Sequence, residues 1–210
     1  MRILITAGGT REYIDPVRFI SNASTGKMGY ALAQKASARG HVVTLVTGPT
    51  AIKPPSRVHL IHVVTSADMF KAVKDNFDAC DCLIMAAAVS DYTPLRTSET
   101  KIKKSAAPLT IELKPTTDIL KWAGRNKNGQ ILVGFALEDE SLREHAEQKL
   151  RDKNLDLIVA NAPGAVGADV STVHIKPADG PWTTLAHTAK TKIAGKLLAQ
   201  IEALARSRPA

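Results

Sequence analysis

Residues 2–47 decide the fold, and they read RILITAGGTREYIDPVRFISNASTGKMGYALAQKASARGHVVTLVT. The short apolar run at 2–6 predicts a strand. Apolar residues recur at helical spacing between 24 and 39, and Gly40 then suits a helix C-terminus, so this segment predicts a helix. The β-branched run at 41–47 predicts a second strand. A strand, a glycine-rich turn, a helix and a strand therefore open the chain.

The same alternation continues to the end of the chain, where two short runs flank the turn sequence PADGP and predict a β-hairpin. Strands apolar on both faces that alternate with helices predict the α/β class, with a mostly parallel sheet covered by helices on both faces. No linker divides the chain, so we expect a single domain over residues 1–210. The further predicted strands are 58–64, 82–88, 109–113, 131–135, 155–160, 171–176 and 182–185, and the further predicted helices are 66–77, 116–127, 141–154 and 188–205.

Charge and composition limit the partners that we expect. The 210 residues carry a net charge of +8, which favours acidic partners. Only 4% of residues are aromatic, too few for the stacking that single-stranded nucleic acid needs, so a small phosphorylated substrate fits better than a nucleic acid. No apolar run is long enough to span a membrane. Cys80 and Cys82 are too close to form a relaxed disulfide, which indicates buried thiols and a cytoplasmic protein.

The first connection between strand and helix has the ingredients of an anion site. Gly8, Gly9 and Gly26 provide turns, and the helix that follows offers unpaired amides at its start. The spacing matches neither G-x-G-x-x-G nor a P-loop, so a long loop with glycine turns is the alternative. Asn22 and Ser24 stand near the predicted helix start as possible N-caps, and a spare Asn amide there could hold a substrate oxygen.

Two later segments add charge at the expected ligand edge. Asp91 follows a predicted central strand, where it could hold a divalent cation, although Asp is also common in turns. Residues 91–108 form a long polar segment with Lys101 in a basic run, which predicts a lid over an anion or else a solvated face. Lys149 and Lys153 share one face of a predicted helix. No nucleophile elbow occurs, so the residues favour chemistry by positioning and charge stabilisation.

At these residues the sequence resembles a known family. GGTRE at 8–12 and IDPVRFISNASTGKMG at 14–29 look like the signature of phosphopantothenoylcysteine synthetase, also called phosphopantothenate–cysteine ligase. Further family segments match in the same order over roughly residues 1–165: AAAVSDY at 86–92, KIKK at 101–104, VGFA at 133–136 and KLRDKNLDLIVAN at 149–161.

The resemblance implies a Rossmann-like domain that works as a homodimer in coenzyme A biosynthesis. Bacterial members use CTP with a divalent cation such as Mg²⁺, and eukaryotic relatives use ATP. The carboxylate of 4′-phosphopantothenate attacks the α-phosphate, which gives an acyl-cytidylate and pyrophosphate, and the amine of L-cysteine then displaces the nucleotide. An ATP-dependent version and a Rossmann-type oxidoreductase are the alternatives, as is a basic binding module without activity.

Roles can be carried over to matching positions. Asn22 and Lys101 are the expected catalytic residues, and Asp91 the expected metal ligand. Substrate is expected at Arg18, Asn22, Ala87 and Ala88. The expected nucleotide-binding residues are Gly8, Gly9, Ser24, Gly26, Asp91, Lys101, Thr117, Asp118, Ile119, Leu120, Phe135, Lys149 and Lys153. Thr116 and Thr117 replace the family's usual Asn-Pro, which puts contacts from that turn in doubt; Thr25 for Ser, and Leu137 with Asp139, are further departures.

Overall fold

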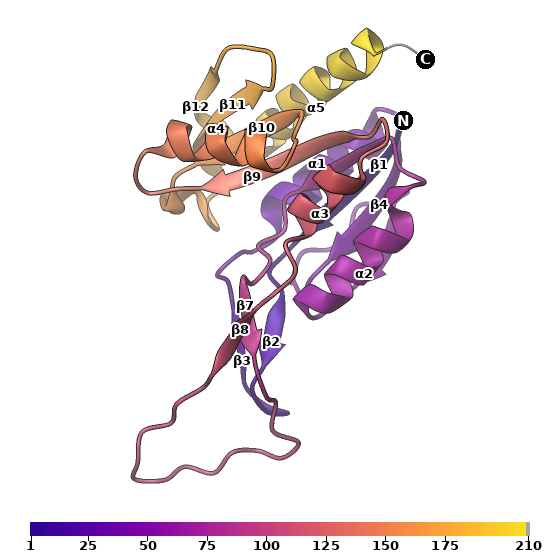
Figure 1. Cartoon of the computed structure of the whole chain (residues 1–210). Helices are drawn as coiled ribbons and strands as arrows, with labels where there is room; N and C mark the ends of the chain where they lie inside the picture. Colours follow the sequence, from indigo (N-terminus) through magenta and orange to yellow (C-terminus); the bar gives the residue numbers. More distant parts are fainter. Residues whose placement is uncertain (209–210) are drawn as a thin grey trace.

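The computed structural model describes residues 1–208 and contains one large sheet of eight strands (Figure 1). The strand order is β12-β11-β10-β9-β6-β1-β4-β5. The six strands from β10 to β5 are parallel to their neighbours, whereas β11 and β12 run antiparallel as the predicted hairpin. The strands are β1 (Arg2–Ala7), β4 (Val42–Thr47), β5 (His59–His62), β6 (Cys82–Met85), β9 (Ile131–Leu137), β10 (Leu157–Asn161), β11 (Val170–Pro177) and β12 (Thr183–Ala189).

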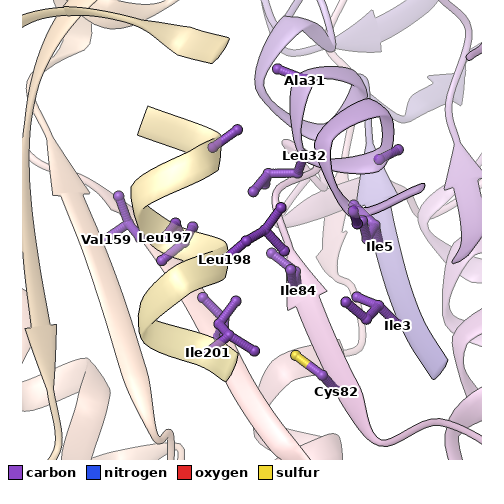
Figure 2. Packing of buried hydrophobic residues seen from close by; sticks show 14 of the residues in the cluster. Ile3, Ile5, Ala31, Leu32, Cys82, Ile84, Val159, Leu197, Leu198 and Ile201 are labelled. Carbon is purple, nitrogen blue, oxygen red and sulfur yellow. The ribbon is translucent and has the colours of Figure 1, made fainter. Parts of the chain in front are cut away.

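Helices cover both faces of the sheet, as the sequence predicts. On one face lie α1 (Lys27–Ala38) and α5 (Lys190–Ser207), which pack on Ile3, Ile5 and Ile84 (Figure 2). On the other face lie α2 (Ser66–Phe77), α3 (Ile119–Asn126) and α4 (Leu142–Asp152), whose buried side chains pack around Leu4. The side chains of β1 alternate between the two layers because successive strand residues point to opposite faces. Both cysteines are free thiols and buried.

Helix ends mostly follow the predicted segments. The helix α2 has the predicted bounds, and its N-cap Thr65 and Asp68 form a capping box. Predicted helices 116–127 and 141–154 shorten at both ends, and in the first of these Asp118 caps α3 by accepting from the amide of Lys121 at 2.9 Å. No helix in the described part of the chain is long and apolar enough to cross a membrane.

A slender arm extends from the carboxyl edge of the sheet (Figure 1). It consists of two antiparallel ribbons, β2 (Arg11–Tyr13) with β3 (Phe19–Ser21) and β7 (Tyr92–Pro94) with β8 (Leu113–Pro115), and β2 contacts β7. The sequence does not predict β2, β3 or β7. The predicted loop at 91–108 is therefore wrong in its bounds, because β7 takes its start and the segment without strands runs over 95–112. The predicted strand at 109–113 likewise lies later, at β8.

Gly29 shows how closely α1 packs on the sheet. A Cβ atom added there would lie 2.5 Å from the Cβ of Ala7 and 2.9 Å from the carbonyl oxygen of Thr6. Both partners belong to β1, so neither can rotate away. The helix therefore needs glycine at this position.

We expect Gly29→Ala to lower the free energy of unfolding by about 1–3 kcal/mol, the usual cost of overpacking a core. Gly195→Ala is the matched control, because Gly195 lies within α5 and an added Cβ would have only the Arg39 guanidinium at 3.8 Å. It should stabilise the protein by about 0.5–1 kcal/mol, since alanine favours a helix over glycine. Urea denaturation measures both, and equal effects of the two substitutions would contradict the close approach of α1 to β1.

Candidate active site

The loops after β1 and β6 are tied together at the carboxyl edge of the sheet. The amide of Ala88 donates to the carbonyl of Gly8 at 2.9 Å, and the amide of Thr10 donates to the carbonyl of Ala88 at 3.3 Å. The strand order reverses at this point, since the chain passes from β1 outward to β4 and later returns to β6 on the other side. Such switch points are where open α/β sheets bind ligands.

A cavity of about 180 Å³ opens beside this tie, between the ends of β6 and β9, the first turn of α3 and the last turn of α4. It brings together many of the residues that the sequence assigns to the nucleotide. The lining consists of Met85, Ala87, Val89, Asp91, Thr116, Thr117, Asp118, Ile119, Leu120, Phe135, Lys149 and Lys153. Thr117 lines the cavity in spite of the departure from the usual Asn-Pro.

The charged side chains of the cavity hold one another in place. Lys153 Nζ lies 2.8 Å from Asp118 Oδ2, and Lys149 Nζ donates to the carbonyl of Phe135 at 2.7 Å. Burial would raise the pKa of Asp118, but the hydrogen bonds from Lys153 and the Lys121 amide, with the charge of Lys149, hold it below its ordinary value. Burial, and then the charge of Lys153, lowers the pKa of Lys149.

Asp91 and Asp118 are the two carboxylates of the cavity, and both are exposed; Asp118 is paired with Lys153, whereas Asp91 is not. Among residues 1–208, no hydrogen bond or ion pair engages its side chain, and no group of three or more His, Cys, Asp or Glu is placed to bind a metal ion. Mg²⁺ in nucleotide sites keeps several waters and takes one or two carboxylates together with phosphate oxygens. The residues present therefore fit a cation that arrives with a phosphorylated ligand, and Asp91 would hold it.

A chain of hydroxyl groups fixes the backbone that carries Asp91. Thr10 Oγ1 accepts from the amide of Ser90 at 3.0 Å and lies 3.2 Å from Ser90 Oγ. Thr116 donates its hydroxyl to the carbonyl of Ser90 at 2.6 Å and its amide to the carbonyl of Asp91 at 2.8 Å. Sequence reasoning missed Thr10 and Ser90 as supports. The only feature of the sequence that could have pointed to them is that each lies within two residues of an expected site residue.

Asn22 does not line the cavity and does not cap α1. The N-cap is Gly26, which has a left-handed backbone at φ 81° and no side-chain cap bond, so the predicted helix start at Ser24 is wrong. Asn22 instead donates its side-chain amide to the carbonyl of Ala88 at 3.1 Å. This bond orients the amide beside Ala87 and Ala88, the residues expected to line the substrate site.

The glycines of the first loop pack on neighbouring backbone. An added Cβ would lie 3.1 Å from the Gly48 carbonyl at Gly8 and 3.1 Å from the Asn22 carbonyl at Gly9. Ser24 Oγ accepts from the Gly26 amide at 3.4 Å. These positions do not line the cavity, so the predicted nucleotide residues divide into a group that lines it and a group in the first loop that does not.

Arg18 and Lys101 belong to the arm and do not line the cavity either. Arg18 follows Asp15 in the turn between β2 and β3, and it donates to the carbonyl of Ile102, the neighbour of Lys101. Within one chain, the structure thus brings Arg18 close to the basic run but brings neither residue to Asp91.

The fold and the cavity define an α/β domain that offers cations and a carboxylate to an anionic ligand at the carboxyl edge of a mostly parallel sheet. Residues 1–204 match the family described as DNA/pantothenate metabolism flavoprotein C-terminal domain, and the chain belongs to this family. This assignment confirms the family resemblance found in the sequence motifs.

Three similar proteins illustrate the relationship. The coenzyme A biosynthesis bifunctional protein CoaBC of Bacillus subtilis is 47% identical over 209 residues, which cover 97% of this chain and 52% of that protein. The crystal structure of the C-terminal domain of a CoaBC protein superposes with a TM-score of 0.87 at 42% identity, covering 99% of this chain and 96% of that one. A mutant of Cab2 in complex with phosphopantothenate-cysteine shares the fold, with a TM-score of 0.82 at 21% identity over 99% of this chain and 89% of that one. The chain spans about half the length of the curated relatives it matches.

We expect Lys153→Met to raise the pKa of Asp118, because burial then opposes ionisation without the lysine partner. The lowered pKa means that the ionised carboxylate stabilises the fold at neutral pH, and that this contribution is lost as the pH falls through the pKa of Asp118, below about 4. The substitution should therefore destabilise the protein more at pH 7 than at a pH low enough to protonate Asp118 in both proteins.

An NMR titration of the Asp118 carboxyl carbon measures this pKa directly. Lys121→Met is the control, because Lys121 contacts Asp118 through its backbone amide and not through its side chain. An unchanged pKa in Lys153→Met would show that the ion pair does not control the ionisation of Asp118.

Proposed function

We propose that the chain joins 4′-phosphopantothenate to L-cysteine through an acyl-cytidylate, with CTP as co-substrate. The observation that carries the proposal is the convergence of Asp91, Asp118, Lys149 and Lys153 on one cavity at the carboxyl edge of the sheet. Family membership supports it, since the Bacillus subtilis relative is a coenzyme A biosynthesis protein. The phosphopantothenate-cysteine bound by Cab2, which has the same fold, points to the same product.

The proposed reaction has two steps, formation of the acyl-cytidylate and its displacement by cysteine. The carboxylate of phosphopantothenate attacks the α-phosphorus of CTP, the bond to the β-phosphate oxygen breaks, and pyrophosphate leaves. The amine of cysteine then attacks the acyl carbon, a proton is lost, and CMP leaves as the amide forms. No protein nucleophile is needed. A bound Mg²⁺ would neutralise charge on the triphosphate.

The chain's own groups would orient these reactants. Lys149 and Lys153 offer positive charge to the nucleotide, and the backbone of residues 117–120 forms one wall. The Asn22 amide donates one N–H to the Ala88 carbonyl, which leaves its second N–H as a donor and its oxygen as an acceptor for the expected acyl group. Preorganised groups of this kind stabilise developing charge without having to rearrange during the reaction.

The cavity of one chain is small for the whole ligand. Ligand pockets usually measure about 300–1,000 Å³, whereas this one measures about 180 Å³. The base and ribose would occupy this space, and the triphosphate would extend outward toward Asp91. A second covering element is therefore needed, and the basic run around Lys101 supplies the matching charge.

A second copy of the chain would supply that cover, and we include a homodimer in the proposal. The arm exposes large apolar side chains that are unusual on a monomer surface. They are Val17, Phe19, Ile20, Tyr92, Leu95, Leu109 and Leu113. A dimer through the arms would bury them and bring Arg18 and Lys101 of one copy toward the other. Sedimentation velocity decides the point, and a monomer at micromolar concentration would contradict it.

Pyrophosphate release tests the activity. With phosphopantothenate, CTP and Mg²⁺ but no cysteine, we expect release to stop near one equivalent per site, because the acyl-cytidylate stays bound. Adding cysteine should restore continuous turnover, and leaving out phosphopantothenate should abolish release. ATP is run in parallel. Equal or faster turnover with ATP would contradict the choice of CTP, and no pyrophosphate from either nucleotide would contradict the ligase assignment.

Asn22→Asp should lower turnover by about 100-fold or more, as loss of an oriented polar group in an active site typically does. Aspartate cannot donate to the Ala88 carbonyl and places a negative charge beside the acyl anhydride. CTP affinity should stay near that of the wild type, because Asn22 does not line the cavity.

Asn126→Asp is the matched control. Asn126 makes the same kind of bond, from its amide to the carbonyl of Trp122 at 2.8 Å, but on the exposed end of α3. Product formation, CTP affinity and the thermal midpoint are compared in both variants. If Asn22→Asp keeps normal activity per folded molecule, Asn22 has only a structural role.

A further inference from the structure

Asp15 is a buried carboxylate to which the sequence motifs assign no role. Its side chain is fully buried, although it lies in the exposed turn between β2 and β3. Charged side chains are rarely buried unless several partners satisfy them. Its partners come from two segments that are more than eighty residues apart in the sequence.

The two oxygens of Asp15 bind different groups. Oδ1 accepts from the backbone amides of Val17 at 2.9 Å and Arg18 at 2.8 Å, which shapes the turn. Oδ2 accepts from the Arg18 guanidinium, at 3.0 Å from Nε and also from Nη2, and from the backbone amide of Ile102 at 3.2 Å. One oxygen thus holds the turn, and the other holds Arg18 and the long loop.

Arg18 closes the ring of contacts. Its Nη2 also donates to the carbonyl of Ile102 at 2.9 Å, so both backbone polar groups of Ile102 are held. The start of the same loop is bound to β2, because the amide of Ser98 donates to the carbonyl of Ile14 at 3.0 Å and Thr97 Oγ1 donates to the carbonyl of Tyr13 at 3.1 Å. Lys101 lies directly before Ile102, so its backbone position follows from this clamp.

We propose that Asp15 is a positioning residue: its carboxylate fixes the Arg18 guanidinium and the Ile102 backbone, and thereby places Lys101, before the substrates bind. The proposal rests on the proposed function, in which Arg18 meets phosphopantothenate and Lys101 meets the nucleotide phosphates. Asp15 itself touches no substrate. It acts by linking Arg18 and Lys101 in one rigid unit.

The carboxylate stays ionised throughout the useful pH range. The hydrogen bonds from Arg18 hold the pKa of Asp15 far below its ordinary value in spite of burial. The groups facing it are the Arg18 guanidinium and backbone amides, all of them donors. The clamp is therefore closed at every pH at which the protein is assayed.

Asp15→Asn distinguishes the two functions of the side chain, which are to hold the turn and to hold Arg18 with Ile102. The amide oxygen can still accept from Val17 and Arg18, so the turn is kept. The amide nitrogen is a donor, however, and it would face the donors of Arg18 and Ile102. We expect hydrogen–deuterium exchange in a peptide covering residues 99–104 to become at least tenfold faster, with peptides from β1 and β9 unchanged.

Asp15→Asn should weaken the productive binding of phosphopantothenate and slow the chemical step. We expect kcat/KM for phosphopantothenate to fall by about 100-fold, which is typical when a catalytic group is misplaced by about 1 Å. CTP affinity should fall by less than this, because the residues that line the cavity are untouched and only the contact of Lys101 with the nucleotide phosphates is lost. If Asp15 had only a structural role, the substitution would lower the thermal midpoint. Both kcat/KM for phosphopantothenate and CTP affinity would then stay at their wild-type values per folded molecule.

Asp68→Asn is the matched control. Asp68 also accepts backbone amides, those of Thr65 at 2.9 Å and Val64 at 3.4 Å, but it belongs to the N-terminal cap of α2 and bonds neither Arg18 nor Ile102. It should lose stability while exchange at 99–104 and kinetics per folded molecule stay normal. If Asp15→Asn behaves in the same way, Asp15 only stabilises the turn and the proposal is wrong.

Measurements on the wild type keep the test decisive if Asp15→Asn does not fold. The amide of Ile102 should exchange at least tenfold more slowly than those of Lys103 and Lys104, for which residues 1–208 provide no hydrogen-bond acceptor. Equal exchange rates would overturn the clamp. A wild-type chain that exchanges as expected but releases no pyrophosphate would contradict the proposed function instead, so the two failures are distinguishable.

Discussion

Backbone pairing between β1 and β6 continues past the ends of both strands, and the arrangement of the site depends on it. The amide of Ala88 donates to the carbonyl of Gly8 at 2.9 Å, and Gly8 has a left-handed backbone at φ 77° that favours glycine. From this tie, one loop leads to Asn22 and the start of α1, and the other leads to Asp91 and the arm. A side chain that separated the two loops would move the substrate group and the cation group apart.

The sequence predicts the layers well and the arm poorly. Long apolar strands such as β1 and β6 and amphipathic helices such as α2 carry periodic signals, and the structure confirms them. The strands of the arm are three residues long, and β7 and β8 each end in proline, so no alternation can build up. The strand β7 pairs with β8 across a long loop and contacts β2 from far away in the sequence. The spacing of apolar residues within a short segment does not reveal such contacts.

The sequence predicts many of the residues that line the cavity, but it does not predict the hydrogen bonds and backbone conformations that hold the site together. Asp91, Lys149 and Lys153 meet at one cavity because the carboxyl ends of neighbouring parallel strands lie side by side. The helix N-cap is a different matter: several polar residues compete for that position, and Gly26 occupies it because only its left-handed backbone lets the loop enter α1 there. The burial of Asp15 is invisible in the sequence, since a charged residue beside proline normally indicates an exposed turn.

The arm also orders events during synthesis. Its first ribbon, β2 with β3, leaves the ribosome early, but the second ribbon is complete only after residue 115. The buried pair Thr10 and Ser90, which joins the two, is separated by 80 positions in the chain. Until the later half emerges, Phe19 and Ile20 belong to an isolated hairpin, which is marginally stable in water. The nascent chain therefore carries this marginally stable hairpin for the time needed to translate nearly half of its length, which makes it a natural target for chaperones.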